Sequence, residues 1–437
     1  PLFPWALAEQ WRISSGGEGA GTASKSKKPW AASLTPGVET YLTAAAWYRS
    51  LGDLTSSDAV LKAAIEELPA GSASPMVHYY LASNARREGK ETEAKRYAAG
   101  AAAAPYEKVF PHRLEDALVL DEARREDPLD AHAPYFLGNF LFAVGRYDDA
   151  SQMWLQALGA GFEYSVLSRN LGLYAWRVKK DLTGAAGFFE KAIELAPDDY
   201  RLYVSLDEIY ASLGDRARRE KLMTNAPAAV AERDTVRVRH ALVNLQQRRY
   251  GQALELLANH NYKPWEGGQV VRRVYVAANL EEGKASLAAG KPREAEQAFR
   301  RALEYPENLG VGTPDKPHDE EALYWLGEAL QAAGNAQAAK EAWDQAVASG
   351  KDAGGPGRVF AALAMRRLGQ ADEAESIFSE LLEAASSEKA GASSLYAAGL
   401  VERYRDRESE AREFFQRAID ADPDFWAAQI ELDRAPI

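Results

Sequence analysis

The sequence predicts an all-α fold, a right-handed superhelical solenoid of about ten or eleven helix hairpins. Three observations predict it. From about residue 38 onward, alanine, leucine and aromatic residues recur at helical spacing between glycine, proline and aspartate interruptions. Continuous runs of β-branched residues are nearly absent. A pattern of small and large residues also repeats along the chain at nearly constant intervals, which indicates stacked helix pairs.

Length and composition exclude several classes of protein. A chain of 437 residues is longer than one compact core usually reaches, ~250 to 300 residues, so we expect several domains or an elongated array. The net charge of −12 disfavours nucleic acid and anionic membranes as partners. No apolar run approaches the ~18 to 20 residues of a membrane span. We therefore expect a soluble, cytoplasmic protein.

Residues 1–37 are predicted to form an N-terminal arm and linker. Glycine, serine and alanine dominate residues 14–37, which also hold a small basic cluster at Lys25, Lys27 and Lys28. The string GGEGAG is not followed by Gly-Lys-Ser/Thr, so a phosphate-binding loop is disfavoured. Because the chain starts at Pro1 without a basic-then-apolar leader, we expect it to be a segment of a longer polypeptide or a processed product.

The repeats are defined by a triplet of small, large apolar and small residues at offsets 0, +4 and +7, which lie on one helical face. The interval from Ala150 to Ala185 is 35 residues, and that from Ala339 to Ala374 is also 35. We expect one array over residues 38–230 and a second, continuous with it, over residues 231–437. The triplets are Ala150, Trp154, Ala157; Ala185, Phe189, Ala192; Ala295, Phe299, Ala302; Ala339, Trp343, Ala346; Ala374, Phe378, Leu381; and Ala411, Phe415, Ala418.

Glycines precede several triplets in a matching register. Gly138 and Gly145 lie seven residues apart, as do the pairs Gly283/Gly290 and Gly327/Gly334. The first glycine of each pair lets two helices approach closely, and the second allows a left-handed turn between them. With Ala150, Trp154 and Ala157, this pattern resembles the tetratricopeptide repeat almost position by position.

Three inter-repeat segments do not fit the array, and they carry a narrower resemblance. The strings FPHRLED, PWEGG and PENLGVGTP resemble the C-terminal half of a bacterial family of uncharacterised proteins. In that family a galactose-mutarotase-like β-sandwich precedes a tetratricopeptide array. The resemblance implies that a carbohydrate-related β-sandwich domain belongs upstream of Pro1.

Catalytic and metal sites find little support in the sequence. With no cysteine, thiolate chemistry and disulfides are excluded. No two of the six histidines have the i, i+4 spacing of a helical metal site, and no GxSxG serine elbow occurs. We therefore predict no catalytic residue, metal or cofactor. Trp265 and Glu266 suit sugar recognition by an aromatic ring and a carboxylate, or else fill a gap between repeats and cap a helix.

Binding is instead expected on the concave face, which the first helix of each tetratricopeptide repeat lines. Counted from the consensus small residue, the inward-facing side chains predicted for binding are Tyr79, Tyr135, Phe136, Asn139, Tyr324, Trp325, Glu328, Tyr396 and Arg403. Arg169, Asn170 and Trp176 join them if the extra residue of their repeat lies in the turn. The loop candidates are His112, Arg113, Trp265, Glu266 and Asn308, of which Asn308 either binds a ligand or forms a tight turn.

The leading hypothesis is a scaffold that binds a partner domain, peptide or glycan through its concave face and irregular loops. The alternative is the helical half of a carbohydrate-active enzyme that contributes loop residues to a shared active site. If the concave aromatic residues serve binding, Tyr135, Asn139, Tyr324 and Trp325 should be substantially exposed. Trp154 and Trp343 should be buried between helices.

Overall fold

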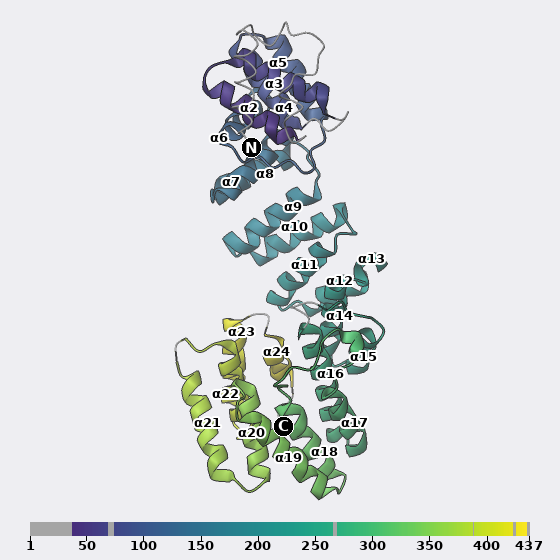
Figure 1. Ribbon diagram of the computed structural model, residues 1–437. Coiled ribbons are helices and arrows are strands. Elements are labelled where there is room, and N and C mark those ends of the chain that lie inside the picture. The colour runs from purple at the N-terminus through teal and green to yellow at the C-terminus, as the bar shows by residue number, and fades with distance from the viewer. Residues whose placement is uncertain (1–36, 69–73, 265–268, 388, 423–424, 435–437) are drawn as a thin grey trace. The chain divides into compact units, whose positions relative to one another are not determined.

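The computed structural model describes residues 37–68, 74–264, 269–387, 389–422 and 425–434. In these ranges every regular element is a helix and no strand occurs, which confirms the all-α prediction. The chain divides into two compact units: unit 1 ends at Asp181 and unit 2 begins at Leu182 (Figure 1). The predicted division at residues 230 and 231 falls within unit 2.

Unit 1 consists of helix hairpins in which each helix packs against the next, as α2 does against α3, α4 against α5 and α7 against α8. Helix α6 is inserted between two hairpins and packs against α4 and α7. The helices are α2 (Val38–Ser50), α3 (Leu54–Glu67), α4 (Pro75–Arg87), α5 (Glu91–Ala103), α6 (Leu114–Glu126), α7 (His132–Ala143), α8 (Tyr147–Gly159), α9 (Ser165–Leu173) and the π-helix η2 (Tyr174–Lys179).

Unit 2 continues the same pattern and ends on a short single helix, α24. The helices are α10 (Leu182–Leu195), α11 (Tyr200–Ser212), α12 (Arg216–Thr224), α13 (Ala228–Ala231), α14 (Asp234–Gln246), α15 (Tyr250–Ala258), α16 (Gln269–Ala288), α17 (Pro292–Ala302), the 3-10 helix η3 (Glu307–Leu309), α18 (Glu320–Ala332), α19 (Ala336–Gly350), α20 (Gly355–Arg367), α21 (Ala371–Ala385), α22 (Ala392–Tyr404), α23 (Glu408–Ala421) and α24 (Trp426–Asp433).

The predicted register of the repeats is confirmed in both units. Every member of the six triplets is buried, with Trp154 2% and Trp343 6% exposed. A Cβ atom at Gly138 or Gly327 would overlap the ring of Trp154 or Trp343, so the small residue of one helix accommodates the large residue of the next. At the turn, Gly334 has a φ of 84°, in the left-handed region that favours glycine.

The segments that did not fit the array, residues 106–116, 259–268 and 304–329, are irregular in part: the first runs into α6, the third contains the start of α18, and residues 265–268 lie outside the described residues. Residues 104–113 lead into α6, residues 259–264 follow α15, and residues 303–319 hold η3 between α17 and α18. The extra residue in the repeat that contains Trp176 does not lie in the turn. The residue is absorbed in the π-helix η2, which wraps one more residue into a turn than an α-helix, and the turn itself comes later, at Lys180.

Candidate functional site: an inner groove of unit 2

Two cavities that share lining residues form a groove in unit 2. We call the first the α16 cavity: it measures about 770 Å³ and lies between α16, residues 305–318, α18 and α24. The second, the α14 cavity, measures about 700 Å³ and lies between α14, residues 262–264, α16 and α24. Arg273 and Trp426 line both cavities. Together the two cavities are the inner groove.

Packing of the neighbouring helices fixes the walls of the groove. Gly283 lets α16 lie against Phe299 of α17, which leaves another face of α16 to line the groove with Val276, Ala277 and Leu280. On α14, Val238 and Leu242 lie one turn apart and line the α14 cavity. The walls are therefore largely apolar.

Asn308 positions the loops at the edge of the groove. Its side-chain amide donates to the carbonyl oxygens of Leu257 at 3.0 Å and His260 at 2.9 Å. The backbone carbonyl oxygen of Asn308 accepts a hydrogen bond from the backbone N–H of Tyr262 at 2.7 Å. The side-chain NH₂ group of Asn308 thus donates to backbone carbonyl oxygens of α15 and of the loop that follows it. This favours the interpretation that Asn308 forms a tight turn.

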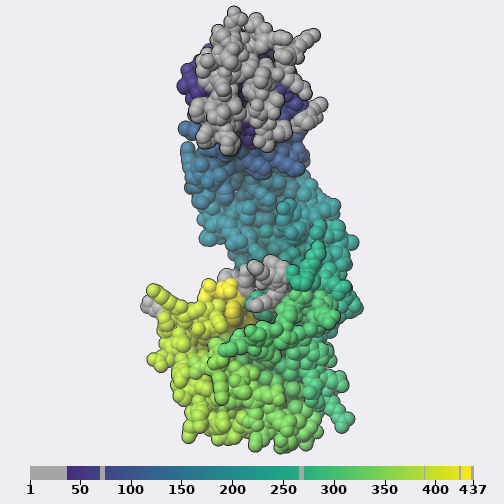
Figure 2. Space-filling model, viewed as in Figure 1, coloured from purple at the N-terminus to yellow at the C-terminus, as the bar shows by residue number. Residues whose placement is uncertain are grey.

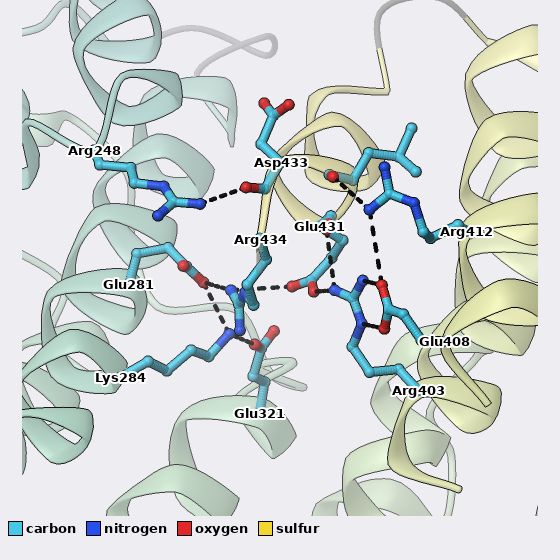
Figure 3. Close-up of polar contacts among 11 residues, drawn as sticks. Arg248, Glu281, Lys284, Glu321, Arg403, Glu408, Arg412, Glu431, Asp433 and Arg434 are labelled. Carbon is cyan, nitrogen blue, oxygen red and sulfur yellow. Dashed lines mark hydrogen bonds and ion pairs between the residues drawn. The ribbon is translucent and has the colours of Figure 1, made fainter. Parts of the chain in front are cut away.

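Helix α24 lies in the groove and is held there by polar contacts to several helices (Figure 3). Glu431, 4% exposed, accepts from Arg403 of α22, and Arg434 donates to Glu281 of α16 at 2.5 Å. The backbone carbonyl of Leu432 accepts from Arg412 of α23 at 2.9 Å. Figure 2 shows the yellow surface of α23 and α24 beside the green surface of preceding helices of unit 2.

The charges around α24 stabilise one another. Burial alone would raise the pKa of Glu281, but the positive charges of Lys284 and Arg434 outweigh it and lower that pKa below its usual value. Burial would lower the pKa of Arg434, yet Glu431 and Glu281 raise it. Lys284 bridges Glu281 at 3.0 Å and Glu321 at 2.7 Å. The charged forms of Glu281, Lys284 and Arg434 are therefore favoured at neutral pH.

Two cations that line the groove form no ion pair with a described residue, although the charge of Lys263 helps to lower the pKa of Asp234, which lines the α14 cavity as well. Arg273, exposed on α16, makes no hydrogen bond or ion pair with any described residue. The same holds for the ammonium group of Lys263 in the part of the chain that the structure describes, although its backbone N–H donates to Asp234. The groove thus offers positive charge next to apolar walls.

Of the predicted residues of unit 2, Tyr396 lines the groove and the others do not. Tyr396 lines the α16 cavity, and Arg403 is 3% exposed with Glu408 and Glu431 as partners. Tyr324 is 5% exposed, and burial raises its pKa to about 12. Trp325 is half-buried and stacks on Phe299 at 6.2 Å between ring centres, and Glu328 pairs with Arg367 at 2.7 Å.

Several predicted residues of unit 1 are core residues, so the expectation of an exposed aromatic face was wrong there, as it was for Tyr324. Tyr79 is 1% exposed and donates to Asp130 at 2.9 Å. Tyr135 and Phe136, 5% and 0% exposed, pack on each other with ring centres 5.3 Å apart. Phe162, from the turn after α8, covers Tyr135, and this inserted ring is why the position is not free.

The structure does bring three predicted polar residues of unit 1 together. Asn139 is half-buried, and its carbonyl oxygen accepts from Trp154 at 3.1 Å and from Asn170 at 3.1 Å. Arg169 donates to Asn170 at 3.2 Å. Trp176 lies apart from them in η2, where the guanidinium of Arg177 covers its ring at 3.5 Å. Mutual hydrogen bonds join the cluster, although the Nε atom of Arg169 is buried without a hydrogen-bond partner.

The loop candidates have mixed outcomes. Arg113 is structural, because it donates to Glu39 at 2.6 Å and to Thr43 at 2.7 Å and so ties α6 to α2. The side chain of His112 is exposed and its ring lies 3.1 Å from the carbonyl oxygen of Phe110. Trp265 and Glu266 lie outside the described residues, so their proposed part in sugar recognition stays a prediction.

Sequence reasoning missed Arg273, Lys263 and Trp426. Arg273 was not among the inward-facing positions counted from the consensus small residue, and Lys263 sits in a segment that matched no repeat. Trp426 follows the last triplet, so the repeat pattern gave it no position. A signal was present: in WAAQIELDR, Trp426 and Ile430 lie one helical turn apart, with acidic residues following.

The described residues form neither a metal-binding cluster nor a membrane-spanning helix. No group of three or more histidine, aspartate or glutamate side chains that could hold a metal ion occurs among the residues that the structure describes. Nor is any described helix both long and apolar enough to cross a membrane.

Comparison with known proteins supports the repeat assignment. Residues 141–200 and 280–356 match the family model of the tetratricopeptide repeat, so the chain carries such repeats. Among solved structures, YrrB, described as a tetratricopeptide repeat protein with an unusual peptide-binding site, is 17% identical with a TM-score of 0.33, over 43% of this chain and 92% of its own. Yeast Tom70 is 14% identical with a TM-score of 0.33, over 99% and 95%. A tetratricopeptide repeat protein from Parabacteroides merdae is 16% identical with a TM-score of 0.28, over 67% and 98%.

Proposed function

We propose that this tetratricopeptide repeat protein is a scaffold that binds a segment of a partner protein in the inner groove of unit 2. The observation that carries the proposal is the pair of cavities that meet at Arg273 and Trp426. Each has the size of a ligand pocket, ~300 to 1,000 Å³, and two in succession suit a chain of several residues better than one small molecule.

The chemistry of the groove specifies the partner segment. Apolar side chains on α14 and α16 favour aliphatic or aromatic residues, which bury area there. Arg273 and Lys263, which lack ion pairs among the described residues, favour carboxylates. The partner segment therefore combines acidic with large apolar residues.

Selection from a displayed peptide library against the purified full chain tests this function. Selected peptides should combine acidic with large apolar residues. Arg273→Glu should weaken their binding at least ~10-fold, since it replaces an attraction by a repulsion inside a groove. Arg358→Glu, the same charge change on α20 outside both cavities, is the matched control and should leave affinity unchanged. Equal binding to the chain and to both variants would place the peptide site elsewhere.

The predictions from the narrower family resemblance stay open. An upstream β-sandwich domain and a glycan remain candidate partners on the sequence resemblance alone. The alternative of a carbohydrate-active enzyme depended on Trp265 and Glu266, which the structure does not describe. An oligosaccharide-binding screen on the same preparation, with Glu266→Gln as the variant, tests that alternative separately.

A further inference from the structure

Helix α24 occupies the inner groove in the way that a bound helical peptide occupies a groove on another protein. Its residues at i, i+3, i+4 and i+7 share one face, the spacing of helix-in-groove recognition. Trp426 and Ile430 line the α16 cavity, the Gln429 amide oxygen accepts from Gln246 of α14 at 2.7 Å, and Asp433 accepts from Arg216 of α12.

The two ends of α24 are held unequally. At its C-terminal end, Glu431 and Arg434 are engaged in ion pairs (Figure 3), and Asp433 forms an ion pair with Arg216 of α12. At its N-terminal end, Trp426 is only half-buried and stands between two cavities of about 770 and 700 Å³. Side chains next to unfilled space forfeit dispersion contacts. Helix α24 therefore fills the groove incompletely.

Helix α24 also leaves positive charge in the groove without a partner. Arg273 lines both cavities that flank Trp426, yet neither α24 nor any other described element pairs with it. Glu431 and Asp433 are committed to Arg403 and Arg216. A helix of the same pattern with one additional carboxylate near its start would satisfy Arg273 as well.

We propose that α24 is an exchangeable occupant of the inner groove, and that the partner is an acidic amphipathic helix that displaces it. This partner repeats the pattern of Trp426, Ile430, Glu431 and Asp433: an aromatic residue, an aliphatic residue four positions later, and acidic residues five and seven positions later. It also carries one more carboxylate, which pairs with Arg273. The inference rests on the proposed function, because it names the partner and the regulation of the same groove.

The tether sets how strongly α24 competes. Helix α23 ends at Ala421 and α24 begins at Trp426, so the connection is short. A segment on a short tether has an effective concentration on the order of millimolar. The apparent dissociation constant of a free helix is then the intrinsic constant divided by the fraction of molecules whose groove is open. Weakening α24 should therefore tighten binding of a helix added in trans.

The first experiment adds a labelled synthetic peptide of residues 422–437 to the full chain. Arg434→Glu in the chain sets a third carboxylate against Glu281 and Glu431 and should release α24 while leaving the groove intact. The peptide should then bind at least ~10-fold more tightly than it binds the unmodified chain. Arg358→Glu, with the same charge change, should leave the affinity unchanged. A peptide that binds no version of the chain overturns the inference, while the library selection still tests the proposed function.

A covalent lock supplies the opposite change, and circular dichroism establishes that each variant is folded. Because the chain has no cysteine, Gln246→Cys with Gln429→Cys creates one specific pair, which a short bis-maleimide can bridge. Peptide binding should be lost after bridging and present before it. Unchanged binding to the bridged chain contradicts exchange of α24, because the peptide then occupies another site.

The carboxylate for Arg273 is tested within the same assay. A peptide with Ala427→Glu places a carboxylate on a residue that lines the α16 cavity together with Arg273. It should bind the Arg434→Glu chain several-fold more tightly than the parent peptide does. The gain should disappear when Arg273→Glu is added to the chain. A gain that persists in that double variant overturns this part of the partner's description.

Discussion

Units 1 and 2 share the packing of small against large residues between helices, but they differ in what covers the remaining aromatic and charged side chains. In unit 1, a cluster of four rings packs with ring centres 4.8 to 5.2 Å apart: Phe162 meets Tyr106 and His132 edge to face, and Tyr135 lies tilted against Phe162. In unit 2, α14, α16 and α24 line a groove in which Arg273 and the side chain of Lys263 form no ion pair with a described residue.

This difference teaches which sequence features indicate binding. The aromatic residues on the first helices of unit 1 belong to a ring cluster that buries itself, and Phe162 and Tyr164, from the segment before α9, complete it. An arginine beside apolar walls with no acidic partner in the described fold has no such internal explanation. We therefore base the proposed binding site on the unpaired charge of Arg273 in a cavity and not on the aromatic residues of the first helices.

The largest expected effect tests the shared packing. Trp154→Ala in unit 1 and Trp343→Ala in unit 2 should each cost ~3 to 5 kcal/mol of unfolding free energy, because each ring is buried against the glycine of the preceding helix. Urea unfolding followed by circular dichroism measures it. A loss in one unit but not the other would mean that the two units do not share the same packing.

The next effect concerns the buried ion pairs that unit 2 uses to hold α24. Arg403→Ala should cost ~3 kcal/mol, because it leaves Glu408 without its bidentate partner and Glu431 buried with only Arg434. Arg358→Ala, which breaks an ion pair with Glu380 on the surface, should cost less than ~1 kcal/mol. Equal costs would indicate that the contacts around α24 are no stronger than surface pairs.

The helix-pair register could be predicted from the sequence because it depends on local spacing. The triplet that contains Trp343, together with Gly327 and Gly334, fixes one hairpin within twenty residues, and each of these residues lies where the pattern put it. The same counting placed Tyr324 on the inner face. It did not show that the position is buried, since that depends on residues far away in the sequence.

The groove could not be predicted for the same reason. It exists because α24 returns to α14 and α16, and Gln246 and Gln429, which meet there, are 183 positions apart. Whether Arg273 has a partner also depends on which acidic residues the array brings near it. Neither the return of α24 to α14 and α16 nor the lack of a partner for Arg273 can be derived from the net charge or from residue spacing along the chain.

A smaller effect sharpens the contrast between packing and binding. Trp325 was expected to serve affinity, but it is half-buried, lines neither cavity and packs on Phe299 with Lys284 over its ring at 5.4 Å. Trp325→Ala should therefore cost ~1 to 2 kcal/mol of stability, less than a fully buried tryptophan, and leave peptide affinity within twofold. Calorimetry with a selected peptide checks the second part, and a large loss of affinity in a folded variant would restore the original expectation.

The smallest effect is a pH dependence that both units should share. Burial lowers the pKa of His132 in unit 1, despite the nearby charge of Asp130, and burial together with Arg249 and Arg237 lowers that of His240 in unit 2. The folded pKa of each lies below the unfolded value of ~6.5. Below that value the unfolded chain takes up more protons than the folded one, so stability falls as the pH drops from about 7 through the folded pKa.

His132→Phe keeps a ring among Tyr106 and Phe162 but does not titrate, so it should flatten the fall in the urea midpoint between pH 7.5 and 5.5. His240→Gln should flatten it independently in unit 2, and the two changes should add because they lie in separate units. A midpoint that falls as steeply in the double variant as in the unmodified chain would show that neither imidazole is buried in its neutral form.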